Sequence, residues 1–382
     1  MKKTIHVPFF EPYIDKQDKN AILKALSSTY LTNGPKLEEF EKNFKKFTGA
    51  KYAIGVSNAT SALHLALKSL DIGKNDEVIV PNLTFVATAN SVLATGATPV
   101  IADVEENTMN ISPESIRKNL SKRTKAIIPV HFAGVSCDMN SISKIAKKNS
   151  ITIIEDCAHG IGTFSGKKHV GNFGEIGCFS FYPTKNITTI EGGMIITNNK
   201  KIANFVKLSR NHGLTRTLID RYSSGFPWEY DVKDVGYNYR LDEIRSTLGI
   251  SQLQKVQQIN KKRRSIFLRY NQGLKNISNI LCPDEKNLEK NSCHLYIIKI
   301  KKTAKISRNN LFKVLQKYGI GCSVHYKPLN ELSILKKKSI SRDSLSVSKK
   351  LSTEILSLPM YPQLTKNKQN YVIQTLKQIF EN

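Results

Sequence analysis

The sequence predicts an α/β protein in which a large domain with a mostly parallel central sheet precedes a smaller C-terminal α+β domain. Three observations predict this class. Short apolar runs recur at regular intervals between residues 78 and 196, and amphipathic helical patterns lie between most of them. The runs are apolar throughout, which is typical of strands that are buried on both faces of a parallel sheet. With 382 residues, 40% of them hydrophobic, the chain is long enough for two cores.

The large domain is predicted to begin with two helices, at residues 37–48 and 60–70, where apolar residues recur at three- and four-residue spacing. Strands are expected in six apolar runs, at residues 78–80, 99–101, 126–130, 151–154, 178–182 and 194–196. The alternation of strands and helices ends near residue 248. We therefore place the large domain at residues 1–248.

The remaining residues, 249–382, are predicted to form the small domain. A long basic helical pattern covers residues 249–275 and a strand follows at residues 295–300. Further helices are expected at residues 311–318, which Gly319 would end, and around residues 372–379. No internal repeat or low-complexity linker interrupts the chain.

The composition argues against several classes of protein. No apolar stretch approaches the roughly 18 residues that a membrane helix needs. The N-terminus begins with two lysines like a secretory signal, but Pro8, Glu11 and Pro12 interrupt any apolar central region. The six cysteines lie far apart without a CxxC pair, so we expect reduced thiols, no metal site, and Cys157 and Cys178 as small buried residues. A cytoplasmic enzyme fits these features best.

The formal net charge of +27 is the unusual feature of the composition. It would attract a phosphorylated ligand by long-range steering, and it is also compatible with nucleic-acid binding. The lysines, however, are scattered over many amphipathic segments and do not form one run interleaved with aromatic residues. A dedicated nucleic-acid function is therefore not expected, and a general lysine bias is the simpler explanation.

Ligands of open α/β sheets bind at the carboxyl ends of the strands, and two such ends carry candidate catalytic residues. The run at residues 151–154 is followed by Glu155 and Asp156, and Lys185 follows the run at residues 178–182. An acidic residue at a strand end is often only solvated, and most lysines are surface charges. A carboxylate and a lysine at the same sheet edge are nevertheless what pyridoxal phosphate (PLP) chemistry requires.

A phosphate site is suggested where the chain turns from a strand into a helix at residues 56–63. Small and hydroxyl residues there, including Ala59 and Thr60, leave the first amides of the helix free for an anion, although an ordinary N-cap would look the same. Gly192 and Gly193, after Glu191, indicate either a plain turn or a close approach of the backbone to a ligand.

Several long motifs occur in an order that identifies a family. They lie at residues 29–35, 57–66, 81–88, 94–100, 155–160, 180–193, 211–213, 236–241 and 325–328. Over nearly the whole chain the sequence resembles the sugar aminotransferases of the DegT/DnrJ/StrS type, which belong to the fold-type I PLP enzymes. The resemblance implies a fold-type I aminotransferase with PLP as its cofactor.

The resemblance also implies roles for individual residues. Lys185 would be the Schiff-base lysine and Asp156 the partner of the pyridine nitrogen. Phe85 would lie against the ring, although without the resemblance it reads equally well as a core residue. His159 matches a position beside the cofactor.

Other matched positions would hold the phosphate. Ala59, Thr60 and Ser180 would bind it within one subunit, and Asn238 matches a residue that reaches the phosphate of the neighbouring subunit. The resemblance therefore implies a homodimer with two shared active sites.

Substrate contacts are carried over less directly. Candidates are Gly34, Glu191, Trp228, His325 and Tyr326. The segment at residues 215–234, which contains Arg221 and Trp228, appears longer than in some relatives and could shape a nucleotide pocket.

The expected reaction is amination of a nucleotide-linked 4-keto-6-deoxy sugar, with glutamate as the amino donor and 2-oxoglutarate as its product. The N-terminal pattern looks more like relatives that act at carbon 4, such as those that make GDP-perosamine, than at carbon 3. The family's dehydratase branch carries His where this chain has Lys185, which favours transamination. The alternatives are amination at carbon 3 or of a keto-cyclitol, a dehydratase, and a PLP- or DNA-binding regulator.

Overall fold

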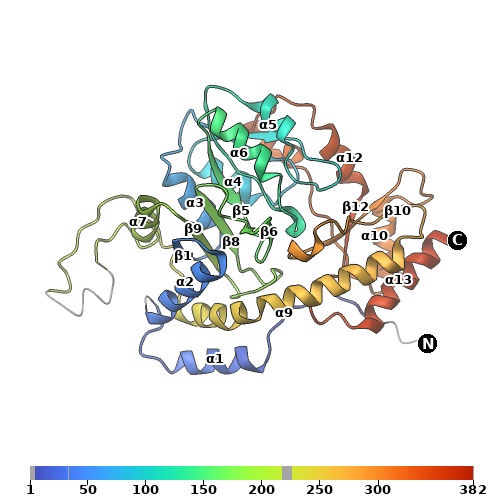
Figure 1. Cartoon of the computed structure of the whole chain (residues 1–382), viewed down its shortest axis with the longest axis horizontal. Coiled ribbons are helices and arrows are strands. Elements are labelled where there is room, and N and C mark those ends of the chain that lie inside the picture. Colours follow the sequence, from blue (N-terminus) through green and yellow to red (C-terminus); the bar gives the residue numbers. More distant parts are fainter. Residues whose placement is uncertain (1–4, 33, 217–225, 382) are drawn as a thin grey trace.

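The computed structural model describes residues 5–32, 34–216 and 226–381. Figure 1 shows two bodies, one around a seven-stranded sheet and one formed by the C-terminal strands and helices. Helix α9 (Glu243–Leu274) runs beneath both of them. Within the described part of the chain, no helix is long and apolar enough to cross a membrane.

The central sheet has the strand order β1-β9-β8-β5-β4-β2-β3. All neighbouring strands are parallel except β9, which is antiparallel to both β1 and β8. The mostly parallel sheet predicted from the sequence is therefore confirmed, and each of the six predicted runs contains or overlaps one of its strands. The strands are β1 (Tyr52–Val56), β2 (Glu77–Pro81), β3 (Thr98–Ala102), β4 (Thr124–Ile127), β5 (Thr152–Asp156), β8 (Ile176–Ser180) and β9 (Gly193–Thr197).

Helices cover both faces of this sheet, as strand β2 illustrates. Successive side chains of a strand point to opposite faces. Val78 and Val80 accordingly pack in the cluster that contains helix α3, whereas Ile79 packs with Ile142 of helix α6 on the other face. The helices of this part are α1 (Lys16–Leu26), α2 (Pro35–Thr48), α3 (Ala59–Lys68), α4 (Ala87–Ala94), α5 (Pro113–Asn119), α6 (Met139–Lys148) and α7 (Lys200–Ser209). A small hairpin, β6 (Phe164–Ser165) and β7 (Lys168–His169), follows β5.

The C-terminal body has its own antiparallel sheet in the order β10-β11-β12 and its own apolar cluster, which includes Tyr270, Tyr296 and Leu311. Val7 from the N-terminal segment packs in the same cluster. The predicted boundary at residue 248 lies inside the continuous helix α9, and the division into two domains stays a prediction. The elements of this part of the chain are β10 (Ile280–Leu281), β11 (Tyr296–Ile300), α10 (Arg308–Lys317), α11 (Ser333–Lys338), α12 (Ser346–Glu354), β12 (Ile355–Leu358) and α13 (Lys366–Glu381). Helix α11 packs on the large sheet instead, since its Leu335 lies in the cluster that contains α3.

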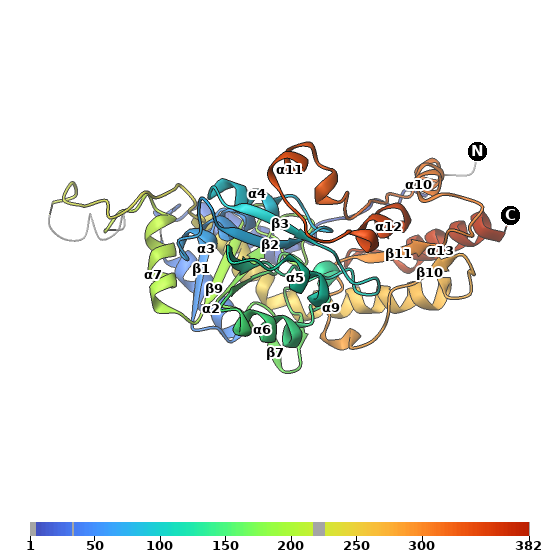
Figure 2. The same cartoon turned by 90° about the horizontal axis from the view of Figure 1, so that it is seen from above.

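The chain that follows α7 extends away from the sheet, as the two views in Figures 1 and 2 agree. Its described residues carry exposed apolar side chains: Phe226 is 57% exposed, Trp228 71% and Val235 74%. Arg221 lies outside the described residues.

Candidate active site

A cavity of about 910 Å³ opens at the carboxyl ends of β5 and β8. Because β5 and β8 are parallel neighbours, the residues that follow them meet at one edge of the sheet. Both residues with a predicted catalytic role, Lys185 and Asp156, line this one cavity. It is also lined by eight of the other residues predicted for the site, namely Ala59, Thr60, Phe85, His159, Ser180, Glu191, His325 and Tyr326.

Asp156 is the last residue of β5, and its carboxylate is buried. Its Oδ2 accepts a hydrogen bond from Thr88 Oγ1 (2.9 Å) and its Oδ1 accepts one from the Ala158 amide (3.1 Å). Burial raises the pKa of Asp156, while these two bonds and the charge of Lys185 act in the opposite direction. A cation brought beside this carboxylate would therefore be bound strongly.

Lys185 lies in the turn after β8, where its amide donates to the Tyr182 carbonyl (2.9 Å). Burial lowers the pKa of its amine to about 8, although the charge of Asp156 opposes the shift. About one amine in ten is then neutral at pH 7, and the neutral amine is the form that attacks a carbonyl group and accepts a proton.

Glu155, the carboxylate adjacent to Asp156, has a structural role. It points to the other face of the sheet and is fully buried. Its oxygens accept hydrogen bonds at 2.6–2.9 Å from His131 Nε2 and from the amides of Gly171, Phe173 and Gly174. These contacts fix the loop around the hairpin, so only the second of the two acidic residues faces the cavity.

The N-terminus of α3 forms another wall of the cavity. Asn58 caps the helix by accepting a hydrogen bond from the Ser61 amide (2.8 Å). The amides of Ala59 and Thr60 have no acceptor within the helix and remain available to an anion. A Cβ at Gly193 would lie 2.5 Å from the carbonyl carbon of Asn58, so Gly193 permits β9 to pack against this turn. This glycine serves the contact between two backbone segments.

The polar groups around the cavity fit PLP. The free amides of α3 and the hydroxyls of Thr60 and Ser180 suit its phosphate, the amine of Lys185 suits its aldehyde, and the carboxylate of Asp156 suits its pyridine nitrogen. The cavity volume of about 910 Å³ also leaves room for a substrate.

Aromatic side chains close the outer side of the cavity. Phe85 is 58% exposed, so its interpretation as a core residue is wrong. Its ring lies 6.0 Å from that of Tyr326, which the C-terminal body contributes together with His325. The Tyr326 hydroxyl lies 3.3 Å from Nε2 of His159, and Nδ1 of His325 lies 2.8 Å from Ser357 Oγ.

Three predicted site residues do not line the cavity of their own chain. The Gly34 amide donates to Glu243 (3.0 Å) at the start of α2. Trp228 stacks on Phe226, with ring centroids 5.0 Å apart, on the segment that extends from the sheet. Asn238 is exposed and pairs with Asn211 through a β-bridge. Any contact of these residues with a substrate or cofactor stays a prediction, and for Asn238 it requires a second subunit.

The structure adds residues that the sequence analysis did not single out. Thr88 bonds to Asp156, and His64 and Tyr239 line the cavity with Nδ1 and the hydroxyl 3.3 Å apart. In the sequence, Thr88 could have been noticed because it lies four residues after Thr84. In the structure the hydroxyl oxygens of these two residues are 3.0 Å apart. Nothing local in the sequence indicates that His64 and Tyr239 meet.

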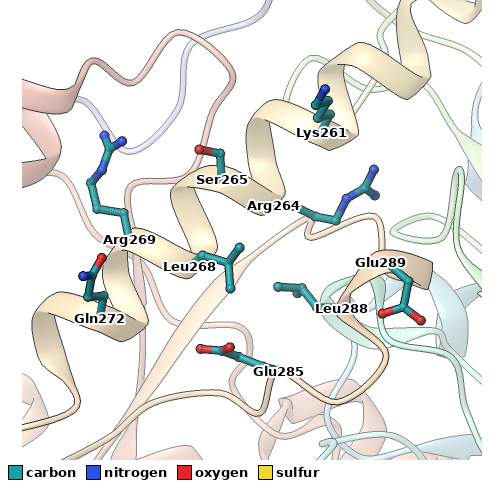
Figure 3. A pocket seen from close by; sticks show the side chains of 9 residues that line it. All are labelled: Lys261, Arg264, Ser265, Leu268, Arg269, Gln272, Glu285, Leu288 and Glu289. Carbon is teal, nitrogen blue, oxygen red and sulfur yellow. The ribbon is translucent and has the colours of Figure 1, made fainter.

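A second cavity, of about 650 Å³, lies on the C-terminal half of α9 (Figure 3). Basic side chains of the helix and acidic side chains of the facing loop surround it, and it shares no residue with the cavity at Lys185. Its lining consists of Lys261, Arg264, Ser265, Leu268, Arg269, Gln272, Glu285, Leu288 and Glu289. Neither Lys185 nor Asp156 lines this second cavity, so the chemistry belongs to the first cavity.

A mostly parallel sheet with a lysine and a carboxylate at one edge, and a helix N-terminus beside them, defines the fold-type I aminotransferase class. Comparison with known proteins agrees. The chain belongs to the DegT/DnrJ/EryC1/StrS aminotransferase family, whose model matches residues 12–377. The family resemblance predicted from the motifs is thus confirmed.

Individual relatives cover almost the full length. The chain is 36% identical over 381 residues to the spore coat polysaccharide biosynthesis protein SpsC of Bacillus subtilis, covering 99% of this chain and 98% of SpsC. Among solved structures, Helicobacter pylori PseC, an aminotransferase involved in the biosynthesis of pseudoaminic acid, matches with a TM-score of 0.91 and 33% identity over 99% of this chain and 100% of PseC. Spr1654 of Streptococcus pneumoniae, solved in a PLP form, matches with a TM-score of 0.91 and 28% identity over 99% of each chain.

Proposed function

We propose that the protein uses PLP to transfer an amino group from glutamate to a nucleotide-linked 4-keto-6-deoxy sugar. The observation that carries this proposal is that Lys185 and Asp156 line one cavity beside the free amides of α3. When bound, PLP supplies an electron-withdrawing ring that stabilises negative charge on the reacting carbon of a substrate.

Lys185 holds the cofactor and then moves a proton. Its Nζ, with a pKa of about 8, accepts a proton from the α carbon of glutamate and returns protons when the sugar is aminated. Positioned general bases of this kind contribute about 10²–10⁴-fold to rates. Asp156 keeps the ring nitrogen protonated through its buried carboxylate, which Thr88 and the Ala158 amide hold in place.

A homodimer with shared active sites is part of the proposal. Asn238 is exposed and lies outside the cavity of its own chain, as expected for a residue that serves the neighbouring subunit. Apolar side chains near the cavity are also exposed: Tyr182 is 47% exposed and Ile190 52%. Exposed apolar side chains around a functional cavity support a protein interface.

The choice of substrate rests on the relatives and on charge. SpsC is named for spore coat polysaccharide biosynthesis and PseC for the biosynthesis of pseudoaminic acid, so we infer a sugar substrate in cytoplasmic polysaccharide biosynthesis. A net charge of +27 favours a substrate with a diphosphate, such as a GDP- or UDP-linked sugar. We place the amination at carbon 4, as in GDP-perosamine formation, because the N-terminal pattern resembles relatives that act at that carbon.

The test is to incubate the purified protein with PLP, glutamate and GDP- or UDP-linked 4-keto-6-deoxy sugars, and to analyse the products by mass spectrometry. We expect a 4-amino sugar nucleotide together with 2-oxoglutarate, and neither product with Lys185→Ala. A product formed only from a 3-keto sugar or a keto-cyclitol would replace the substrate, and loss of water without amination would indicate a dehydratase. Absence of cofactor absorbance, together with salt-sensitive retention on DNA, would favour a regulator.

A further inference from the structure

A second histidine lies behind His159, outside the cavity. His294 lies two residues before the start of β11, and its ring packs on that of His159 with centroids 4.2 Å apart and planes 32° apart. Both side chains are buried, with 5% of His159 and 4% of His294 exposed. The sequence analysis did not single out His294, and it does not belong to the described residues that line the cavity.

The hydrogen bonds of Asn186 determine which nitrogen of His294 carries the proton. Asn186 Nδ2 donates to Asn260 Oδ1 (2.7 Å) and to the Ser292 carbonyl (2.7 Å), so both of its hydrogens are used. Asn186 Oδ1 is then an acceptor, and it faces His294 Nδ1 at 3.0 Å. Nδ1 of His294 therefore carries a hydrogen and donates it to Asn186, the residue next to Lys185.

The same reasoning assigns the proton of His159. The Ala133 amide donates to His159 Nδ1 (3.3 Å), so in the neutral ring the hydrogen is on Nε2. Nε2 faces the Tyr326 hydroxyl at 3.3 Å, near the long end of the hydrogen-bond range. Tyr326 accepts this bond, and its own hydroxyl hydrogen remains available to a ligand in the cavity. Burial lowers the pKa of both histidines well below the usual value, which keeps both rings neutral.

The backbone of His294 supports this arrangement. Its amide donates to the Ala133 carbonyl (3.0 Å), so it holds the residue whose own amide orients His159. Arg263 from α9 donates to the His294 carbonyl (3.1 Å). His294 is thus fixed from both bodies of the protein.

We propose that His294 is a positioning residue: anchored to Asn186, its ring holds the imidazole of His159 so that Nε2–H bonds to Tyr326 and the phenolic hydrogen faces the cavity. We expect this orientation in the protein without cofactor, because all the contacts that produce it lie within the chain. Its consequence for turnover rests on the proposed function, because Tyr326 would then donate a hydrogen bond to an oxygen of the cofactor or substrate.

The first test measures the proton positions directly. Protein labelled with ¹⁵N-histidine and free of cofactor is examined by NMR, and a His159→Gln variant identifies the His159 signals. We expect a protonated Nε2 for His159 and a protonated Nδ1 for His294. The opposite tautomer of either ring in the wild-type protein overturns the proposal, whether or not the enzyme aminates sugars.

The second test separates the stacked ring from the hydrogen bond to Asn186. His294→Phe keeps a flat ring and loses the donor, whereas His294→Gln keeps a donor and loses the ring. In both variants the ring of His159 should shift and lose its hydrogen bonds with the Ala133 amide and Tyr326, so His159 should become a mixture of tautomers. The rate constant of the glutamate half-reaction should then fall by up to about 10²-fold, with little change in glutamate affinity. His169→Gln is the control, because His169 is equally buried but lies in the β6–β7 hairpin. Wild-type rates and an unchanged His159 spectrum in both His294 variants would refute the role.

Discussion

The lowered pKa of Lys185 leads to a quantitative prediction about how the apoenzyme takes up PLP. A pKa of about 8 leaves about one amine in ten neutral at pH 7, against about one in three thousand at the ordinary lysine pKa of 10.5. The rate of covalent attachment should rise about tenfold per pH unit below pH 8 and level off above it, because only the neutral amine reacts. The sign follows from burial, which disfavours the charged form.

The perturbation is Asp156→Asn. Asp156 is the group whose charge raises the pKa of Lys185, so removing that charge should move the midpoint of the pH profile below 8. The measurement is stopped-flow absorbance on mixing apoenzyme with PLP over a range of pH. Nα-acetyl-lysine is the control amine, and its rate should continue to rise towards pH 10. A wild-type rate that also rises to pH 10, or a midpoint that moves upward in Asp156→Asn, would refute the reasoning.

Three further predictions concern other parts of the site. Asn58→Ala should destabilise the protein by about 1 kcal/mol through loss of the α3 cap, and should weaken phosphate binding, as measured by urea unfolding and PLP titration. Glu155→Gln should destabilise the protein by about 3 kcal/mol, because it places an amide against buried donors; unchanged unfolding would contradict the structural role. Lys185→Ala and Asn238→Ala should each be inactive alone. When equal amounts of the two variants are dissociated and allowed to reassociate at random, about half of the dimers contain one subunit of each kind. One of the two sites in each such dimer is intact, so the mixture should recover about a quarter of wild-type activity, and no recovery would rule out shared sites.

Much of the fold follows from local sequence because the buried strands and amphipathic helices have short-range patterns. The β2 run illustrates this, since Val78, Ile79 and Val80 are all apolar and contact helices on both faces. The extent of α9 was not predictable in the same way. The helix begins at Glu243, whose carboxylate accepts a hydrogen bond from the Gly34 amide at the start of α2. No periodic pattern in the sequence distinguishes these first helical residues from the preceding loop, so the start of α9 was not predicted.

The candidate site was predictable where a residue type is tied to a strand end, as for Asp156 and Lys185. The sequence alone could not say whether Glu155 or Asp156 faces the ligand, because alternation along a strand shows that they point to opposite faces without showing which face is open. Residues such as Tyr239 and His294 reach the site only through contacts with distant segments. Such contacts leave no local pattern.

Helix α9 limits how the enzyme can respond to its substrate. It is 32 residues long and continuous, so it spans about 48 Å and belongs to both bodies at once. It contains no proline, and Gly249 is held against Phe40, where a Cβ would lie 2.6 Å from the ring. A hinge motion between the bodies would have to bend this helix. We therefore expect the distance across the cavity from Lys185 to Tyr326 to be established during folding, with substrate entering a preformed site.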